Sequence, residues 1–328
     1  RVFTVGRNQA RAFSAAAPPI IDMKQIAAEP KSSDQCVREI AAACADWGFF
    51  QVVNHGISPS LLTTFEKEVQ NFYALPLAEK MKIKRTEENA RGFYNDEYTK
   101  QVIDWKEGFD FGVPDPSPID GTNQWPESLP EFRTILELWF KEMERLSFTL
   151  LSCFCAGLGQ HHTALHDTFS AHSSYLRLNN YPPAPQVGDR LCISRHTDAG
   201  FLTVLWTTPV ASLQVYRGTG DGAGFDVDDP DWVTIHPEPN SFIINTGDQM
   251  QVYSNDRYKA PLHRVLPNTA ERRLSAPFFF NPSYDMDVAP CLEPALYRPI
   301  NWGEFRSLRF QGDYADVGEE VQISHYRI

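Results

Sequence analysis

The sequence has no apolar run that approaches the roughly 20 residues of a membrane span. None of its six cysteines forms a CxxC pair, and most of them lie among apolar neighbours. We therefore expect free, partly buried thiols in a reducing compartment rather than a disulfide framework. Positive charge is scarce, because 30 basic side chains face 42 acidic ones and the net charge is -12. A phosphate-binding surface needs concentrated positive charge, so these deficits argue against nucleic-acid and membrane partners.

Acidic residues are absent from the first 17 residues, which contain several Ala and one Ser together with Arg1, Arg7 and Arg11. This composition is typical of an organelle transit-peptide remnant, and a flexible basic arm would have it as well. We expect a cytoplasmic protein, with a plastid or mitochondrial location as the alternative if residues 1–17 are a transit-peptide remnant.

The 328 residues are 42% hydrophobic and 22% charged, a balance that suits a globular protein with ample core. No internal repeat or low-complexity linker interrupts them. Hydrophobic periodicity predicts a mostly helical region at 18–170. That region is expected to pack continuously on a β-rich core at 171–328, which ends in a helical cap.

Three helices are predicted in the first half of the chain. Ser32 and Gln35 fit a capping box for the first, and Gly48 is expected to end it before a strand at 49–53. A second helix ends before Pro76, and a third runs from near Pro130 to about residue 158. The inner side of the third helix is expected to carry Ile135, Leu138, Trp139, Met143, Leu146 and Leu150.

From Tyr175 the pattern changes to short β-rich runs between turn signals, which indicate a sandwich or barrel. The runs are SYLRLNNY, LCISRHT, FLTVLW, SLQVY, WVTIH, SFIINTG, HRVLP and LSAPFFF. Residues 217–231 are rich in Gly and Asp, so they are predicted to form an exposed, mobile hairpin loop. A short helix is expected near residues 302–309.

His196 and Asp198 stand two residues apart at the start of a predicted strand, so their side chains share a face. An imidazole and a carboxylate suit a divalent transition metal, and His263, in a β-like run bounded by prolines, is the best third ligand. Two His and one carboxylate form the facial triad of non-haem Fe(II) oxygenases, although HxD pairs also arise by chance. Four other histidines crowd a polar connection and are expected to face solvent: His161, His162, His166 and His172.

Arg273 and Ser275 also stand two apart, in an apolar strand that begins ten residues after His263. An inward guanidinium in such a strand is costly without an anionic partner. A dicarboxylate co-substrate would supply one, since Arg pairs bidentately with a carboxylate and Ser adds a donor. The alternative is a salt bridge from Arg273 to an acid of the protein itself.

Further motifs follow one another along nearly the whole chain. They are PPIIDM (18–23), WGFFQVVNHGIS (47–58), FYALPLAEKMK (72–82), DWKEGFDFG (104–112), LRLNNYPP (176–183), HTDAGFLTVLW (196–206), SLQV (212–215), FIINTGDQMQVYSNDRYKAPLHRV (242–265) and RRLSAPFFFNP (272–282). In this order they resemble the plant and fungal branch of Fe(II)/2-oxoglutarate-dependent dioxygenases, which includes isopenicillin N synthase, flavonoid and gibberellin oxidases and ACC oxidase.

The resemblance implies an α+β fold, a double-stranded β-helix or jelly roll with helices buttressing one side. It implies Fe(II) on His196, Asp198 and His263, and O2 and 2-oxoglutarate as co-substrates, with ascorbate as a stimulant. It places the distal carboxylate of 2-oxoglutarate on Arg273 and Ser275. The remaining residues that it assigns are Asn179 and Tyr181, near the co-substrate, and His55, in a structural motif. Asn180 and the loop 217–231 depart from the pattern of many relatives.

The resemblance implies an oxygenase of specialised metabolism that hydroxylates, desaturates or cyclises a small organic molecule and releases succinate and CO2. Relatives that keep these motifs without using 2-oxoglutarate give one alternative, and a catalytically silent jelly-roll binding protein gives another. Many relatives are monomers, so a monomer is expected. Aromatic residues of the less regular segments are the predicted substrate contacts: Phe93, Tyr94, Tyr98, Phe280, Trp302 and Phe305.

Overall fold

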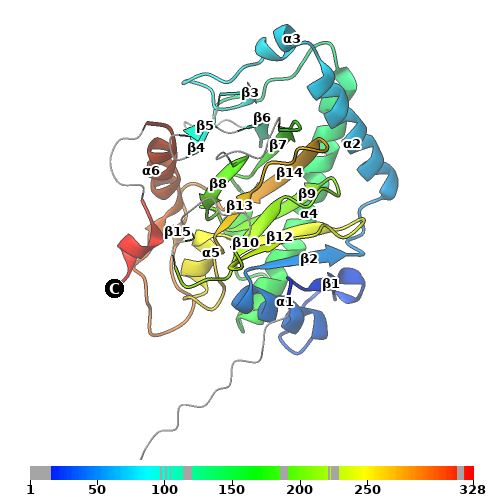
Figure 1. Ribbon diagram of the computed structural model, residues 1–328. Helices are drawn as coiled ribbons and strands as arrows, with labels where there is room; N and C mark the ends of the chain where they lie inside the picture. The colour runs from blue at the N-terminus through cyan, green and yellow to red at the C-terminus, as the bar shows by residue number, and fades with distance from the viewer. Residues whose placement is uncertain are drawn as a thin grey trace, which may run out of the picture.

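Two β-sheets face each other across the centre of the computed structural model, and helices cover the outer face of the larger sheet (Figure 1). The structure describes residues 16–96, 98–99, 102–103, 105–113, 120–184, 191–220, 222, 229–315 and 321–328. The predicted basic arm lies mostly outside these residues, as do residues 221 and 223–228 of the predicted mobile loop. The two facing sheets with their helical cover confirm the predicted jelly roll.

The larger sheet has eight strands and is antiparallel except where β1 and β2 pair. In spatial order its strands are β1 (Ile20–Asp22), β2 (Phe49–Val53), β12 (Phe242–Thr246), β9 (Leu202–Thr207), β14 (Arg273–Phe280), β7 (Tyr175–Tyr181), β6 (Glu107–Gly112) and β3 (Gly92–Tyr94). Segments from both halves of the chain therefore build one sheet.

The smaller sheet is antiparallel and covers one face of the larger one. Its strands, in spatial order, are β11 (Trp232–Thr234), β10 (Leu213–Tyr216), β13 (His263–Val265) and β8 (Ile193–His196). Two short hairpins stand apart from both sheets: β4 (Tyr98–Thr99) with β5 (Val102–Ile103), and β15 (Asp287–Val288) with β16 (Ile300–Asn301).

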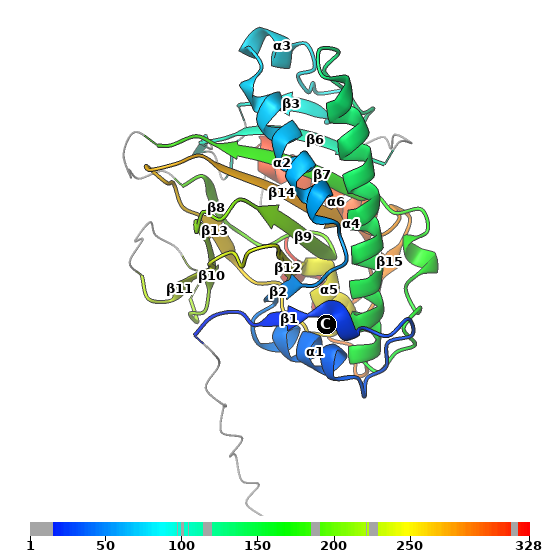
Figure 2. The ribbon, with the colours of Figure 1, turned by 90° about the vertical axis from the view of Figure 1, so that its right-hand side faces the viewer.

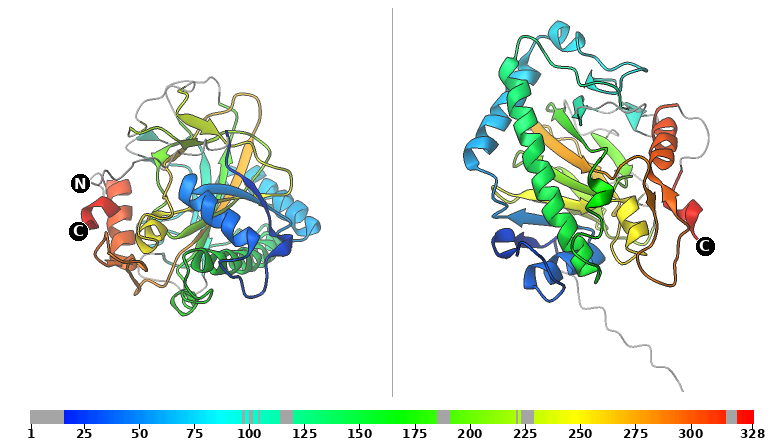
Figure 3. Two further views of the ribbon diagram at one scale, coloured as in Figure 1. Left: turned by 90° about the horizontal axis from the view of Figure 1, so that it is seen from below. Right: turned by 180° about the vertical axis from the view of Figure 1, so that it is seen from behind.

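The longest helix, α4 (Pro130–Gly157), runs along the outer face of the larger sheet and packs against α1 (Gln35–Asp46) and α2 (Pro59–Ala74) (Figures 2 and 3). The other helices are α3 (Leu77–Met81), α5 (Asp248–Tyr253) and α6 (Trp302–Ala315), with 3₁₀ turns at Met23–Gln25, Asp167–Phe169 and Ile323–Tyr326. No helix within the described ranges combines the length and apolar character needed to cross a membrane.

Strand alternation divides the side chains of the larger sheet between two environments. Even-numbered residues of β14 face α4, where Phe278 packs against Phe140 and Phe280 against Phe148. Odd-numbered residues of the same strand face the smaller sheet. One face of the sheet thus completes the helical core, while the other lines the space between the sheets.

Gly48 ends α1, as the sequence predicts, but the start of the helix differs from the prediction. Gly48 adopts a φ of +67°, and a Cβ at this position would lie 2.5 Å from the Lys259 carbonyl oxygen. The predicted capping box at Ser32 is wrong, because Asp34 is the N-cap residue and Gln35 is the first helical residue. The Asp34 carboxylate accepts a hydrogen bond from the Lys31 backbone N–H at 2.9 Å, so it stabilises the turn before the helix.

Leu138 is the one incorrect residue on the predicted inner side of α4, since 46% of it is exposed. The buried stripe follows spacings of three and four residues, which place Leu136 and Trp139 inside and turn Leu138 outward.

His172 is a second correction. It was expected to face solvent, yet its side chain is mostly covered and its Nε2 lies 2.7 Å from a Glu144 carboxylate oxygen. All six cysteines are free and five are buried, as expected.

Candidate active site

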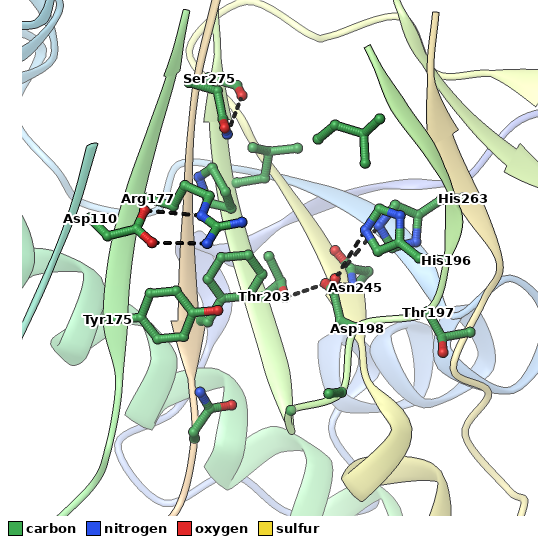
Figure 4. A pocket seen from close by; sticks show the side chains of 18 of the residues that line it. Asp110, Tyr175, Arg177, His196, Thr197, Asp198, Thr203, Asn245, His263 and Ser275 are labelled. Atoms are coloured by element: carbon green, nitrogen blue, oxygen red, sulfur yellow. Dashed lines mark hydrogen bonds and ion pairs between the residues drawn. The ribbon is translucent and has the colours of Figure 1, made fainter. Parts of the chain in front are cut away.

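A cavity of about 220 Å³ lies between the two sheets (Figure 4). Its wall on the larger sheet follows strand alternation, because the odd-numbered residues of β7 and β14 point into it. From β7 these residues are Tyr175, Arg177, Asn179 and Tyr181, and from β14 they are Arg273, Ser275, Pro277 and Phe279. The smaller sheet contributes His196 and His263 to the opposite wall.

His196 and His263 are directly paired across β8 and β13, so their rings are neighbours on one face of the smaller sheet. Asp198 follows β8 and turns its carboxylate toward both rings (Figure 4). Its Oδ1 lies 3.7 Å from His196 Nε2 and 3.6 Å from His263 Nε2. One potential ligand atom from each residue lies within 4.8 Å of the other two. The structure therefore brings together the three predicted metal ligands.

Backbone carbonyls set the tautomer of both histidines. His196 Nδ1 lies 2.8 Å from the Ser194 carbonyl oxygen, and His263 Nδ1 lies 3.0 Å from the Pro261 carbonyl oxygen. A carbonyl only accepts, so each Nδ1 carries a hydrogen. In the neutral tautomer with this hydrogen, each Nε2 offers its lone pair to a metal at the point where the rings meet.

Within the part of the chain that the structure describes, hydrogen bonds hold the carboxylate of Asp198 through Oδ2. Its Oδ2 accepts hydrogen bonds from Thr203 Oγ1 at 2.6 Å and from Asn245 Nδ2 at 2.7 Å. Oδ1 is thereby left facing the two histidines. Burial raises the pKa of Asp198, but His263, His196 and these two hydrogen bonds outweigh it and lower the pKa. The carboxylate is therefore ionised, as a metal ligand must be.

Burial and the neighbouring His263 lower the pKa of His196 to about 3. The imidazole is consequently neutral at physiological pH and able to donate its Nε2 lone pair. Two imidazoles and one carboxylate are a donor set that suits Fe(II) in oxygenases.

Four polar side chains form a second group at one end of the cavity. In the register of β7 and β14, Arg273 pairs with Tyr181 and Ser275 pairs with Asn179. All four therefore stand side by side on one face, and Asn179 Nδ2 donates to Ser275 Oγ at 3.3 Å. The structure brings together every residue that the sequence predicted for 2-oxoglutarate.

Arg273 is only 2% exposed. Among the described residues no carboxylate lies within 4.0 Å of its guanidinium, and its Nε has no hydrogen-bond partner. Burial lowers the pKa of Arg273, which reflects the cost of a charge removed from water. The Oδ1 of Asn179 is buried and unpaired as well. The alternative of a protein salt bridge for Arg273 is therefore not observed, and this group has room for an anionic ligand.

A third group of charged residues went unrecognised in the sequence. Arg177 and Asp110 are directly paired across β7 and β6, and the guanidinium makes a bidentate contact at 3.0 and 2.8 Å. Arg91 Nη2 lies 2.9 Å from an Asp120 oxygen. In Figure 4 the Arg177 guanidinium extends from Asp110 toward the triad. These contacts could not be predicted from sequence spacing, because the partners are far apart in the chain and are brought together only by the register of the strands.

Trp302 is the only predicted substrate contact among the described residues that line the cavity. Phe93, Phe280 and Phe305 lie fully buried in the helical core instead. Tyr94 is buried beside the cavity, where its hydroxyl donates to Asp110 at 3.3 Å. The side chain of Tyr98 lies outside the described residues. Phe280 points away because side chains alternate along β14. Arg273, Ser275 and Phe279 face the cavity, so Phe280 faces the opposite side of the sheet.

His55 lies away from the cavity, as expected for a structural residue. Its Nε2 donates to the Asn240 carbonyl at 3.1 Å, and its Nδ1 accepts from the Ile57 N–H at 3.2 Å. The ring also packs edge-on against Phe242. His55 therefore fastens the turn after β2 to the start of β12.

Two family models match the chain. Residues 18–128 match the model described as non-haem dioxygenase in morphine synthesis N-terminal, and residues 172–282 match that of the 2OG-Fe(II) oxygenase superfamily. Jasmonate-induced oxygenase 4 of Arabidopsis thaliana is 34% identical over 302 residues, which cover 88% of this chain and 81% of the relative.

Solved structures have the same architecture. JOX2 in complex with 2OG, Fe and JA superposes with a TM-score of 0.76 at 29% identity, over 89% of this chain and 84% of JOX2. The dioxygenase for auxin oxidation in rice gives a TM-score of 0.71 at 24% identity, over 94% of this chain and 99% of the rice protein. The likeness to the rice protein supports the fold alone, because its identity is low.

Proposed function

Because the chain belongs to the 2OG-Fe(II) oxygenase superfamily, we propose that it oxidises a small organic anion at the cavity between its sheets. It is an oxidoreductase that uses Fe(II), 2-oxoglutarate and O2 on a small molecule. The alternative without 2-oxoglutarate is not favoured, since a solved relative contains both 2OG and Fe. The oxidation is a hydroxylation, a desaturation or a cyclisation.

His196, Asp198 and His263 are proposed to hold the iron through Nε2, Oδ1 and Nε2. Iron held there would supply the chemistry by which O2 oxidises 2-oxoglutarate to succinate and CO2 and oxidises the substrate. The protein contributes the placement of these groups. Ser194 and Pro261 orient the rings by accepting their Nδ1 protons, while Thr203 and Asn245 restrain Asp198.

Arg273 and Ser275 are proposed to bind the carboxylate of 2-oxoglutarate that is remote from the iron. A guanidinium and a hydroxyl can together donate three hydrogen bonds to one carboxylate. Asn179 and Tyr181 would contact the same molecule from β7. The observation in support is the buried Arg273 charge, which has no carboxylate partner in the described protein.

The anionic character of the proposed substrate rests on the charges around the cavity. The whole chain carries a net charge of -12. The cavity reverses this balance, because seven cationic side chains and three carboxylates line it. They are Arg85, Arg91, Lys106, Arg177, Arg273, Arg306 and Arg309, against Asp110, Asp120 and Asp198. These cations give the cavity a positive potential, which favours anionic ligands there.

Tyr175 and Phe279 would contact the apolar side of the substrate. Their rings stack at a centroid distance of 4.7 Å on the wall formed by β7 and β14. Arg306 lies over Tyr175, with its guanidinium carbon 5.7 Å from the ring centroid. An apolar wall beside a cation suits a molecule with a carbon skeleton and one acidic group.

Turnover of matched acids and methyl esters tests this proposal. The protein would be incubated with Fe(II), 2-oxoglutarate, O2 and each compound, and succinate would be measured. We expect one acid to stimulate succinate formation, with its ester about 10- to 100-fold less effective, as the loss of a charge-assisted hydrogen bond predicts. Equal turnover of acid and ester would contradict the anionic assignment, and turnover without succinate would contradict the use of 2-oxoglutarate.

A further inference from the structure

We infer that Arg309 is a positioning residue, which holds the loop carrying Asp198 and ties it to the C-terminal segment at residues 321–328. Arg309 projects from α6 into the wall of the cavity and is 4% exposed. It is not one of the proposed iron or 2-oxoglutarate ligands. The inference rests on the proposed function, because it assigns to Arg309 an effect on the proposed metal site.

The guanidinium of Arg309 reaches three separate parts of the chain. Its Nη2 donates to Thr197 at the backbone oxygen, 3.4 Å, and at Oγ1, 3.3 Å. The same Nη2 lies 3.6 Å from Asp248 Oδ2. Its Nη1 donates to the Val321 carbonyl at 2.8 Å. One side chain therefore joins the loop after β8, the start of α5 and the C-terminal segment.

Thr197 is the residue between two proposed ligands, His196 and Asp198, and Figure 4 shows it beside the triad. A movement of Thr197 changes the separation of the His196 ring and the Asp198 carboxylate. The loop is short and lies outside the strands, so no ladder hydrogen bonds of its own fix it. Its spacing must be fixed by contacts from other elements.

Helix α5 supplies one set of these contacts through its backbone. The Asp248 N–H donates to the Asp198 carbonyl at 2.8 Å, and the Gln249 N–H donates to the Gly200 carbonyl at 3.0 Å. Arg309 supplies a side-chain contact to Thr197, one residue earlier, and it also faces the Asp248 carboxylate. Asp248 and Arg309 thus restrain the same loop from two elements, and loss of Arg309 removes a cation facing a buried carboxylate.

Groups that orient metal ligands typically change metal affinity about 10- to 100-fold when they are removed. We therefore expect Arg309→Met to weaken binding of Co(II), a spectroscopic substitute for Fe(II), by about that factor. The probe is Co(II) alone, titrated into the metal-free full-length protein and followed by its ligand-field absorption. Arg309→Lys keeps the charge near Asp248 without the planar fork, so an intermediate Kd is expected.

Arg298→Met is the matched control. Arg298 also holds the C-terminal segment, since its Nη2 donates to the His325 carbonyl at 2.9 Å and its guanidinium lies over Tyr326. Its contacts with His325 and Tyr326 lie in the C-terminal segment and away from the loop 197–200. Arg298→Met should lower the melting temperature, because it removes a contact that holds the C-terminal segment. Its Kd for Co(II) should stay at the wild-type value.

Thr197→Val gives a second test that leaves Arg309 in place. It removes the Oγ1 contact at nearly constant volume, so a smaller loss of Co(II) affinity is expected. In the Arg309→Met background the same change should have no further effect.

Unchanged Co(II) affinity in Arg309→Met, or an equal loss in Arg298→Met, would overturn the inference. If Arg309→Met does not fold, Thr197→Val decides alone, and unchanged affinity there overturns it. Failure of the wild-type protein to bind Co(II) would instead overturn the proposed function.

Discussion

At the scale of single residues, the chemistry of the cavity depends on hydrogen bonds that point away from it. Ser194 and Pro261 accept the Nδ1 protons of the two histidines, and Thr203 and Asn245 occupy one oxygen of Asp198. Each of these partners fixes which atom remains for a metal. The donor set is thereby arranged before any ion binds, which lowers the reorganisation that binding requires.

Arg273→Met is predicted to raise the KM for 2-oxoglutarate by about 10- to 100-fold, because a charge-assisted contact to a carboxylate is lost. The neighbouring Arg272→Met is the control, since Arg272 is exposed and precedes β14. Succinate formation at a range of 2-oxoglutarate concentrations measures both. The assignment of Arg273 would be wrong if the two variants had the same KM.

The residues predicted from the sequence are those whose partners lie close along the chain. Arg273 and Ser275 share a face of β14 because a strand alternates every second residue. Asp198 turns its carboxylate toward His196 from the loop directly after β8. Asp110 and Arg177 could not be found in this way, because they meet only through the register of β6 and β7. The iron and 2-oxoglutarate groups were therefore predictable, and the charged group of Arg177 and Asp110 was not.

At the scale of elements, β14 carries two adjacent phenylalanines with different expected roles. Phe280 contributes to stability, and Phe279 contacts the substrate. Phe280→Ala should lower the free energy of unfolding by about 3–5 kcal/mol, because Phe280 packs between Phe148 and Phe169 in the helical core. Phe279→Ala should cost much less stability and raise the KM for substrate. Chemical denaturation and steady-state kinetics separate the two effects. The reverse pattern would show that the face assignment of β14 is wrong.

Helices with long apolar stripes were predicted well, and their ends and margins less well. The stripe of α4 is strong enough that its bounds are nearly as predicted, yet Leu138 lies one position beyond it. Ser32 has the side chain of an N-cap residue, but Asp34 is closer to the apolar run and takes that position. Local capping preferences are worth about 1 kcal/mol, so the apolar face decides where a helix lies.

At the scale of the whole molecule, contacts such as those of His55 join the helical region to the sheets. Burial and the nearby Arg145 lower the pKa of His55, and its hydrogen bond to Asn240 only partly opposes them. Below pH ~6.5 the His55 side chain therefore binds a proton more readily in the unfolded chain than in the folded protein. The free energy of unfolding should be fully retained above that pH and should fall as the pH drops below it.

His55→Gln should consequently show a shallower loss of stability between pH 7 and pH 5 than the wild-type protein, as about one proton fewer is taken up on unfolding. Denaturant titrations at several pH values measure this slope. His236→Gln, the same substitution at an exposed position, is the control. An unchanged slope in His55→Gln would refute the assignment.

The division at residues 18–170 and 171–328 stays a prediction, as do the monomeric state and the cellular location. Strands from both sides of that division share the larger sheet, since β2 pairs with β12 and β6 pairs with β7. Continuous packing of this kind is what the absence of a linker in the sequence predicts. The two regions meet at the cavity, where residues of the N-terminal region such as Phe49, Arg91 and Asp110 join the C-terminal strands in its lining.

The central claim is that one cavity holds Fe(II) on His196, Asp198 and His263 and 2-oxoglutarate on Arg273. Anaerobic addition of 2-oxoglutarate to the Fe(II)-loaded protein tests it most directly, because a chelated 2-oxo acid gives a visible charge-transfer band. The account predicts this band in the wild type, its absence in His263→Ala, and its formation in Arg273→Met only at about 10- to 100-fold higher 2-oxoglutarate. A band of wild-type strength and concentration dependence in His263→Ala would contradict the account.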